Sequence, residues 1–167
     1  MKAAVVYSTL TGNTRKVAEA VRAAMPEGTG LYAVEDAPAP EQFDLIAMGF
    51  WVDRGVADAK AAAYMKTITG KKVFSFFTLG ADPNSEHAKS CVEKTPQFYG
   101  ENCESIGTFH CQGAVDPKMI EWMMKLPPEH PHAPNEERRK RWAEAALHPN
   151  QADFDAAAEA VRKALTK

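Results

Sequence analysis

A short turn near the start of the chain concentrates side-chain hydroxyls. Ser8, Thr9, Thr11 and Thr14 lie close together around Gly12. An apolar run precedes the turn, and apolar residues at helical spacing follow it, which predicts a strand–turn–helix junction. The first amides of a helix lack acceptors and carry partial positive charge, so they bind anions. Hydroxyl donors and a glycine that permits close backbone approach suit a phosphate group in particular.

Two other phosphate-binding patterns do not fit this chain. The Walker pattern requires Gly-Lys-Ser/Thr, but Asn13 and Thr14 follow Gly12. Residues 28–33 contain Gly-x-Gly, but this segment follows a helix and enters a strand, the reverse of a dinucleotide-binding turn. The remaining alternative is a hydroxyl-rich turn that binds no ligand.

Composition excludes several classes of partner. Lys and Arg number 20 against 22 Asp and Glu, so the net charge of −2 gives no general attraction to nucleic acid or an anionic membrane. No apolar run is long enough to span a bilayer. Three cysteines without a C-x-x-C pair favour a reducing compartment over a disulfide scaffold. His130 and His132 have no third ligand at metal spacing. We therefore expect a cytoplasmic protein with no metal, nucleic-acid or membrane partner.

The turn must be positioned by the elements around it. Apolar runs predict strands, and helical periodicities predict helices between them. The predicted strands are residues 3–7, 30–34, 44–50, 72–79 and 105–111, and the predicted helices begin at about residues 14, 56, 82 and 150. Asp82 before Pro83 is typical of a helix start, and Asn150 with Asp153 is typical of a capping box. This alternation predicts an α/β fold with a doubly wound, five-stranded parallel sheet.

Residues 114–149 interrupt the alternation. Two helical patches, at about 117–126 and 135–147, flank a proline-rich stretch that disfavours helix. The segment is too short for a core of its own. We interpret it as an insertion before the last helix of a single domain covering residues 1–167.

The hydroxyl-rich turn also carries a family resemblance. The pattern Val5-Val6-Tyr7-x-Thr9-x-x-Gly12-x-Thr14-x-x-x-Ala18-x-x-Val21 resembles the FMN-phosphate signature of the flavodoxin family. The resemblance covers about residues 1–112 and 150–166. It implies the strand order 2-1-3-4-5 and FMN as the cofactor. The phosphate-binding residues would be Ser8, Thr9, Leu10, Thr11, Gly12, Asn13 and Thr14.

Further residues are implied for the flavin ring. Ligands of doubly wound sheets bind beyond the carboxyl ends of the strands, where the strand order reverses. There Trp51 is the candidate for stacking on the ring, while Phe50 either borders the ring or belongs to the core. The resemblance also implies that the peptide group of Gly55 turns toward the ring. It also places the loop after the fourth strand along the ring edge, with Thr78, Leu79, Gly80, Ala81 and Asp82.

The outer face of the ring lacks an obvious cover. Short flavodoxins commonly place a tyrosine in the loop after the fourth strand, and this sequence has none there. The face is therefore open, or is covered by the insertion or a partner. Trp122 and Trp142 either serve as this cover or pack their helices against the domain.

The resemblance implies an FMN-binding electron carrier that passes electrons from a reductase to a partner oxidoreductase. One alternative is an FMN-dependent NAD(P)H oxidoreductase that acts on a small acceptor such as a quinone. Another is a flavin-free scaffold or regulator. The insertion, residues 49–55 and His148-Pro149-Asn150 also resemble a short flavodoxin-like family found beside bacterial bilirubin reductases, which implies a bilirubin reductase as a redox partner.

Overall fold

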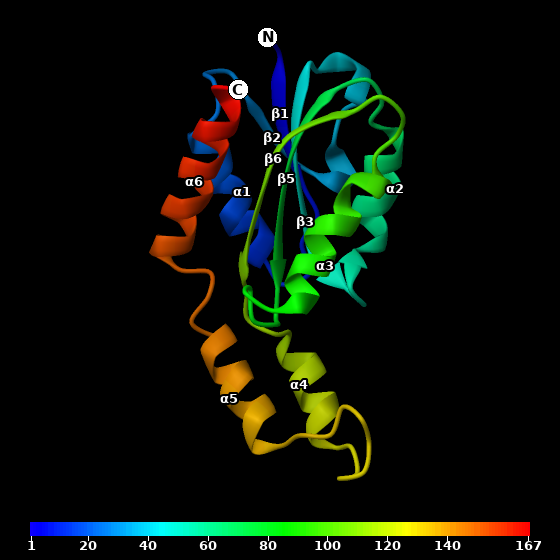
Figure 1. Cartoon of the computed structure of the whole chain (residues 1–167), viewed down its shortest axis with the longest axis vertical. Helices are drawn as coiled ribbons and strands as arrows, with labels where there is room; N and C mark the ends of the chain where they lie inside the picture. The colour runs from blue at the N-terminus through cyan, green and yellow to red at the C-terminus, as the bar shows by residue number, and fades with distance from the viewer.

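A parallel sheet organises the chain, whose residues 1–167 are all described by a computed structural model (Figure 1). Its parallel strands are β1 (Ala3–Tyr7), β2 (Gly30–Ala33), β3 (Leu45–Asp53), β5 (Lys72–Leu79) and β6 (Glu104–Gln112). Their order is β2-β1-β3-β5-β6, so the predicted α/β fold and the 2-1-3-4-5 order of parallel strands are confirmed. The carboxyl ends of β1 and β3 thus meet where the order reverses, the place at which such sheets bind ligands.

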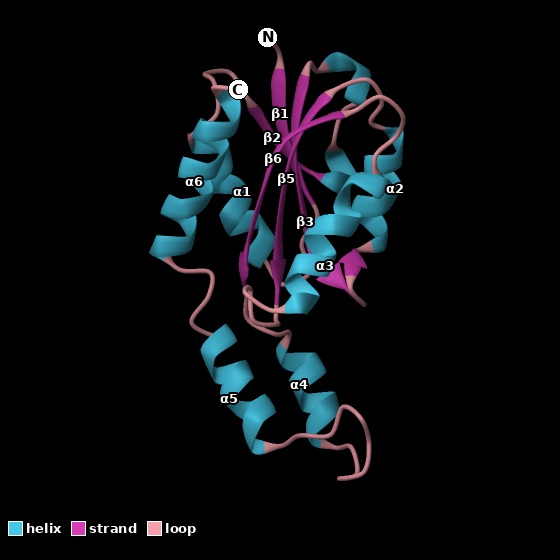
Figure 2. Ribbon diagram, viewed as in Figure 1, coloured by secondary structure: helices cyan, strands magenta, loops and turns pink.

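Two helix pairs cover the two faces of the sheet (Figure 2). The pairs are α1 (Asn13–Ala23) with α6 (Gln151–Leu165), and α2 (Ala59–Thr67) with α3 (Glu86–Lys94). All residues of β1 are buried, and alternate side chains enter opposite clusters. Val5 packs with the α1/α6 side and Val6 with the α2/α3 side, as the period-2 geometry of a strand requires. Short 3₁₀ helices complete the connections: η1 (Val34–Asp36), η2 (Pro40–Gln42) and η3 (Thr95–Phe98).

Two predicted helix starts are wrong. The helix expected from residue 56 begins at Ala59, because Asp58 caps it and the residues before Asp58 form a strand. The helix expected at Asp82 begins at Glu86, because Ser85 accepts the capping hydrogen bond. Asp82 instead accepts the amide of Asn84 within a turn. The capping box at Asn150 is confirmed.

The third strand is longer than predicted and folds back on itself. It continues to Asp53 and pairs antiparallel with β4 (Val56–Ala57). Arg54 and Gly55 connect the two strands, with φ of 52° and 84°. A two-residue hairpin turn with positive φ at both positions matches the right-handed twist of the strands. The chain after residue 50 is therefore not a loop: Trp51 still pairs with Thr78 of β5, and residues 52–57 form the hairpin beyond the parallel ladder.

The insertion forms an arm, defined here as residues 114–149, which projects beyond the carboxyl ends of the strands (Figures 1 and 2). It contains α4 (Pro117–Met124) and α5 (Glu136–Ala145), close to the two predicted helical patches. No residue of α4 is buried, and α5 buries only Ala145. The Arg138 guanidinium donates to the carbonyls of Pro131 and Ala133, which holds the connecting loop. No helix combines the length and apolar character needed to cross a bilayer.

Two buried thiols are expected to be unreactive in the folded protein. Burial, with a smaller contribution from the Asp153 carboxylate, raises the pKa of Cys111 to about 12, and burial also raises the pKa of Cys91. Since the thiolate is the reactive form, both should react with a disulfide reagent at pH 8 more slowly in the native protein than in urea, and Cys111 by at least about 100-fold. A Cys103→Ser variant isolates the two thiols. Equal rates with and without urea would contradict the prediction.

The same Cys111 shift has a consequence for stability. Between its ordinary pKa of 9.0 and about 12, the folded state keeps a proton that the unfolded state has lost. The protonated Cys111 thiol therefore contributes to the free energy of unfolding in full below pH 9, and this contribution is lost as the pH rises from 9 to about 12. Urea unfolding from pH 8 to 11 should show a falling midpoint. The fall should be smaller in Cys111→Ala.

Candidate functional site

A cavity of about 570 Å³ lies at the carboxyl ends of the central strands. Its lining comes from the start of α1, the end of β3 and its hairpin turn, the end of β5, residues 113–116, and α4. This volume lies within the usual range for small-molecule sites. The topology therefore brings together segments that are distant in sequence, including the hydroxyl-rich turn and Trp51.

The first turn of α1 offers backbone donors to this cavity. Every other α-helix has a side chain that caps its N-terminus: Asp58, Ser85, Asp116, Asn135 and Asn150. Helix α1 instead has Gly12 at the cap position, with φ of 98°, no side-chain cap and no acidic residue in its first turn. Amides without an acceptor in the chain belong to Thr9, Leu10, Thr11, Asn13, Thr14 and Arg15. This terminus is therefore suited to an anionic ligand.

The hydroxyls of the turn have different tasks. Thr11 makes no side-chain hydrogen bond within the protein, whereas Thr9 Oγ1 accepts the Gly12 amide at 2.9 Å. Thr14 Oγ1 lies 2.9 Å from Thr78 Oγ1, so one hydroxyl of this buried pair keeps a free proton. The Asn13 amide group donates to the Ala114 carbonyl at 3.0 Å. Leu10, Thr11, Asn13 and Thr14 all line the cavity together with Thr9.

Ser8 does not line the cavity. Its hydroxyl is buried and donates to Asp58 Oδ2 at 2.5 Å. Asp58 also accepts the backbone amides of Trp51 and Ala61, at 3.3 Å each. A single buried carboxylate thus joins the turn, the end of β3 and the start of α2. Asp58 was not among the site residues expected from the sequence, although an aspartate directly before a helical run is a signal for a cap.

The two aromatic residues at the end of β3 occupy different environments. Phe50 is 1% exposed and stacks on Phe77, with ring centroids 5.1 Å apart and an interplanar angle of 18°. Phe77 stacks in turn on His110. Trp51, the next residue in the strand, is half-buried and lines the cavity. Because alternate residues of a strand point to opposite sides, the structure separates a core residue from a cavity residue.

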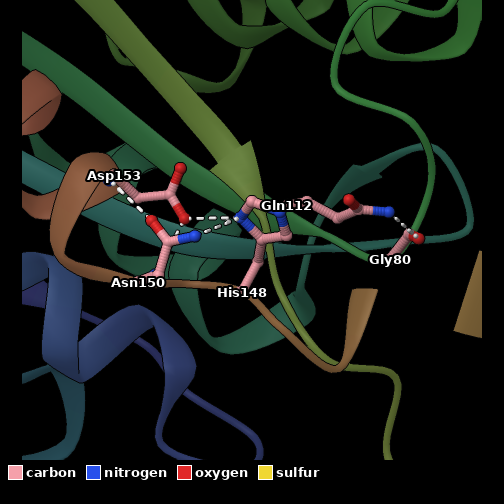
Figure 3. Close-up of polar contacts among 5 residues, drawn as sticks. All are labelled: Gly80, Gln112, His148, Asn150 and Asp153. Atoms are coloured by element: carbon pink, nitrogen blue, oxygen red, sulfur yellow. Dashed lines mark hydrogen bonds and ion pairs between the residues drawn. The ribbon is translucent and has the colours of Figure 1, made fainter. Parts of the chain in front are cut away.

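The predicted ring-edge residues are divided between the cavity and its surroundings. Thr78, Leu79 and Gly80 line the cavity, whereas Ala81 and Asp82 do not. A Cβ atom at Gly80 would lie 2.8 Å from Val115 Cγ2, so a glycine is needed for the approach of the arm. Figure 3 shows Gln112 Nε2 donating to the Gly80 carbonyl, at 3.3 Å.

Gly55 also lies outside the cavity lining. Its carbonyl accepts the Cys91 thiol of α3, with 3.4 Å between sulfur and oxygen. A turn of this peptide toward the cavity would require this contact to break.

The arm contributes a wall of the cavity, which the sequence left open as an alternative through Trp122 or Trp142; of these two, only Trp122 lines the cavity. The lining includes Met119, Trp122 and Met123 of α4 and His132 of the following loop. Asp53, Arg54 and Asp116 add charged groups. The interruption of the strand–helix alternation was the signal available in the sequence, but it did not show on which side of the sheet the insertion lies.

A polar cluster holds the base of the arm (Figure 3). Asp153 Oδ2 lies 2.7 Å from His148 Nδ1 and accepts the Asn150 amide at 2.8 Å. The His148 carbonyl accepts the Ala114 amide at 3.0 Å, so the first residue of the arm is bonded to a residue at its end. Since Asn13 also binds Ala114, the arm base is connected directly to the start of α1.

Comparisons with known proteins bear on the family and the fold of the chain. The flavodoxin domain family matches residues 4–162. A flavodoxin-like domain-containing protein BilS from Clostridioides difficile is 29% identical over 161 residues, covering 92% of this chain and 90% of that protein. A BilS protein from Clostridium symbiosum is 27% identical over 139 residues, covering 72% of this chain and 73% of that protein.

Solved structures support the fold. A flavoprotein from Lactobacillus acidophilus, crystallised in complex with FMN, has a TM-score of 0.52 and 18% identity, covering 72% of this chain and 97% of that chain. A Streptococcus pneumonia flavodoxin has a TM-score of 0.50 and 15% identity, covering 93% of this chain and 99% of that chain.

Proposed function

The chain belongs to the flavodoxin domain family, and from that premise we propose that its cavity binds FMN and that the protein transfers electrons between redox partners. The observation that carries this proposal is the shared cavity. One volume of about 570 Å³ is lined both by the uncapped start of α1 and by Trp51. A phosphate-bearing ligand with a flat aromatic ring matches these two features together.

The turn before α1 fits the phosphate. The unpaired amides of this terminus and the Thr11 hydroxyl would donate to the phosphate oxygens, and the positive end of the helix dipole favours their charge. Gly12 adopts a left-handed φ of 98° that other residues rarely adopt, which brings the first turn of amides into the cavity.

The other end of the cavity fits the ring. Trp51 offers a flat apolar surface, and the backbone of residues 78–80 borders the lining. Bound FMN supplies the electron-accepting group, and the protein adjusts its reduction potential. The Asp53 and Asp116 carboxylates oppose added negative charge in this region, while the Arg54 guanidinium offsets part of their effect.

The redox partner is inferred from the relatives. Two BilS proteins are similar to this chain. The insertion, residues 49–55 and His148-Pro149-Asn150 resemble a family found beside bilirubin reductases. We infer that the partner is a reductase of bilirubin or a similar tetrapyrrole. The net charge of −2 gives little long-range electrostatic attraction to a partner. Association with the reductase should therefore rely on local contacts and should change little with ionic strength.

The test of this function begins with an absorption spectrum of the purified protein after incubation with FMN and gel filtration. We expect retained flavin that is identified as FMN after extraction. Reduction should require an added reductase, whereas rapid bleaching by NADPH alone would favour the oxidoreductase. A protein that remains colourless would overturn the proposal.

A further inference from the structure

Trp122 lies on a helix that has no core of its own to pack against. No residue of α4 is buried, yet Trp122 lines the cavity together with Met119 and Met123. Resting on the proposed function, we propose that Trp122 is the second aromatic wall of the flavin site and packs on the ring from the arm. This assigns ring-binding to the insertion, an element outside the strand–helix alternation that builds the rest of the site.

The exposure of Trp122 argues against a purely structural role. Its side chain is 49% exposed, and Met119 beside it is 48% exposed. The aromatic neighbour of Trp122 is His130, whose ring meets the indole edge-on, with 6.1 Å between the ring centroids and an interplanar angle of 85°. Such a contact orients the indole without covering it. A ligand ring in the cavity would bury apolar surface that is now in contact with water.

Hydrogen bonds at the base of the arm keep α4, and with it Trp122, beside the cavity. Asn13 Nδ2, in the turn proposed to hold the phosphate, donates to the Ala114 carbonyl at 3.0 Å. Ala114 in turn donates to the His148 carbonyl at 3.0 Å. The first and last parts of the arm are therefore bonded next to the phosphate end of the cavity, which limits how far α4 can move away.

A second tryptophan on the arm provides a matched control. Trp142 lies on α5, is half-buried and does not line the cavity. Substitution of either tryptophan by alanine removes the same group from the arm. Only Trp122→Ala removes it from the cavity, and because that side chain is not buried in the core, the variant should fold.

The experiment titrates apo-protein with FMN and follows flavin fluorescence, with circular dichroism as a check of folding. Stacked indoles quench flavin fluorescence, and because Trp51 is present in every variant, a difference in the brightness of bound flavin between Trp122→Ala and the wild type reports the Trp122 contact. Trp122→Ala should weaken binding about 10-fold, a typical loss when one stacking aromatic is removed. It should also leave the bound flavin brighter, while Trp122→Phe recovers most of the affinity.

The outcomes separate this proposal from the proposed function. Trp142→Ala should match the wild type in both affinity and quenching. If the wild type binds FMN and Trp122→Ala binds it equally tightly with equal quenching, the second wall is refuted and the FMN site stands. If the wild type binds no FMN, both proposals are overturned.

Discussion

Thr11→Glu is expected to weaken FMN binding by about 100-fold. Thr11 is exposed at the mouth of the uncapped α1 terminus, and its hydroxyl makes no hydrogen bond within the protein. A carboxylate there would face the phosphate and would also offer a cap to the free amides. Two unit charges about 6 Å apart near a protein surface repel by ~3 kcal/mol, which corresponds to about 100-fold in affinity. Isothermal titration with FMN at low ionic strength measures the change.

Two control variants show whether the added charge acts locally. Thr11→Val removes the hydroxyl without adding charge, and it should cost less than about 10-fold, the value of one hydrogen bond. Gln97→Glu adds the same charge at an exposed position outside the cavity and should leave the affinity unchanged. An affinity of Thr11→Glu within threefold of the wild type would show that the phosphate binds elsewhere.

Adjacent substitutions at Phe50 and Trp51 are expected to separate stability from binding. Phe50→Ala should lower the free energy of unfolding by about 3–5 kcal/mol, because it leaves a cavity beside Phe77 in the core. Trp51→Ala should destabilise the protein less, since Trp51 is only half-buried. It should weaken FMN binding by about 30-fold, as the loss of one stacking partner is worth ~2 kcal/mol.

The comparison requires both measurements on both variants. Urea unfolding of the apo-proteins gives the stabilities, and FMN titration under conditions where each variant is folded gives the affinities. Phe50→Leu provides a milder core change that should leave the affinity near that of the wild type. A larger loss of affinity for Phe50→Leu than for Trp51→Ala would reverse the assigned roles.

The arm adds apolar side chains to the surface around the opening of the cavity. Leu10, Met119 and Trp122 all line the cavity and are about half exposed, so apolar side chains surround its opening. The net charge of the chain is only −2. Contact with a redox partner at this opening should therefore involve apolar burial as well as charge, and the rate of electron transfer should fall only modestly as salt is raised.

Local pattern was sufficient for the parallel strands and for the start of α1, while the strand order came from the family resemblance. The apolar runs of β1 and β3 are readable because strands covered on both faces need apolar residues at every position. The apolar residues at helical spacing after the turn correctly predicted α1, whose buried face includes Val17, Ala18 and Val21. The predicted helix starts at Val56 and Asp82 were wrong. Helix caps and hairpin pairs depend on individual hydrogen bonds, and the apolar pattern does not specify which atoms make them.

The sequence by itself determined the fold class and the location of the hydroxyl-rich turn, because both follow from the spacing of neighbouring residues. Only the tertiary structure decided which side chains face the cavity. It turned Ser8 toward Asp58, buried Phe50 against Phe77 and brought Trp122 to the cavity. These assignments depend on contacts between segments far apart in the chain, and a single sequence carries no record of the directions in which such segments approach one another.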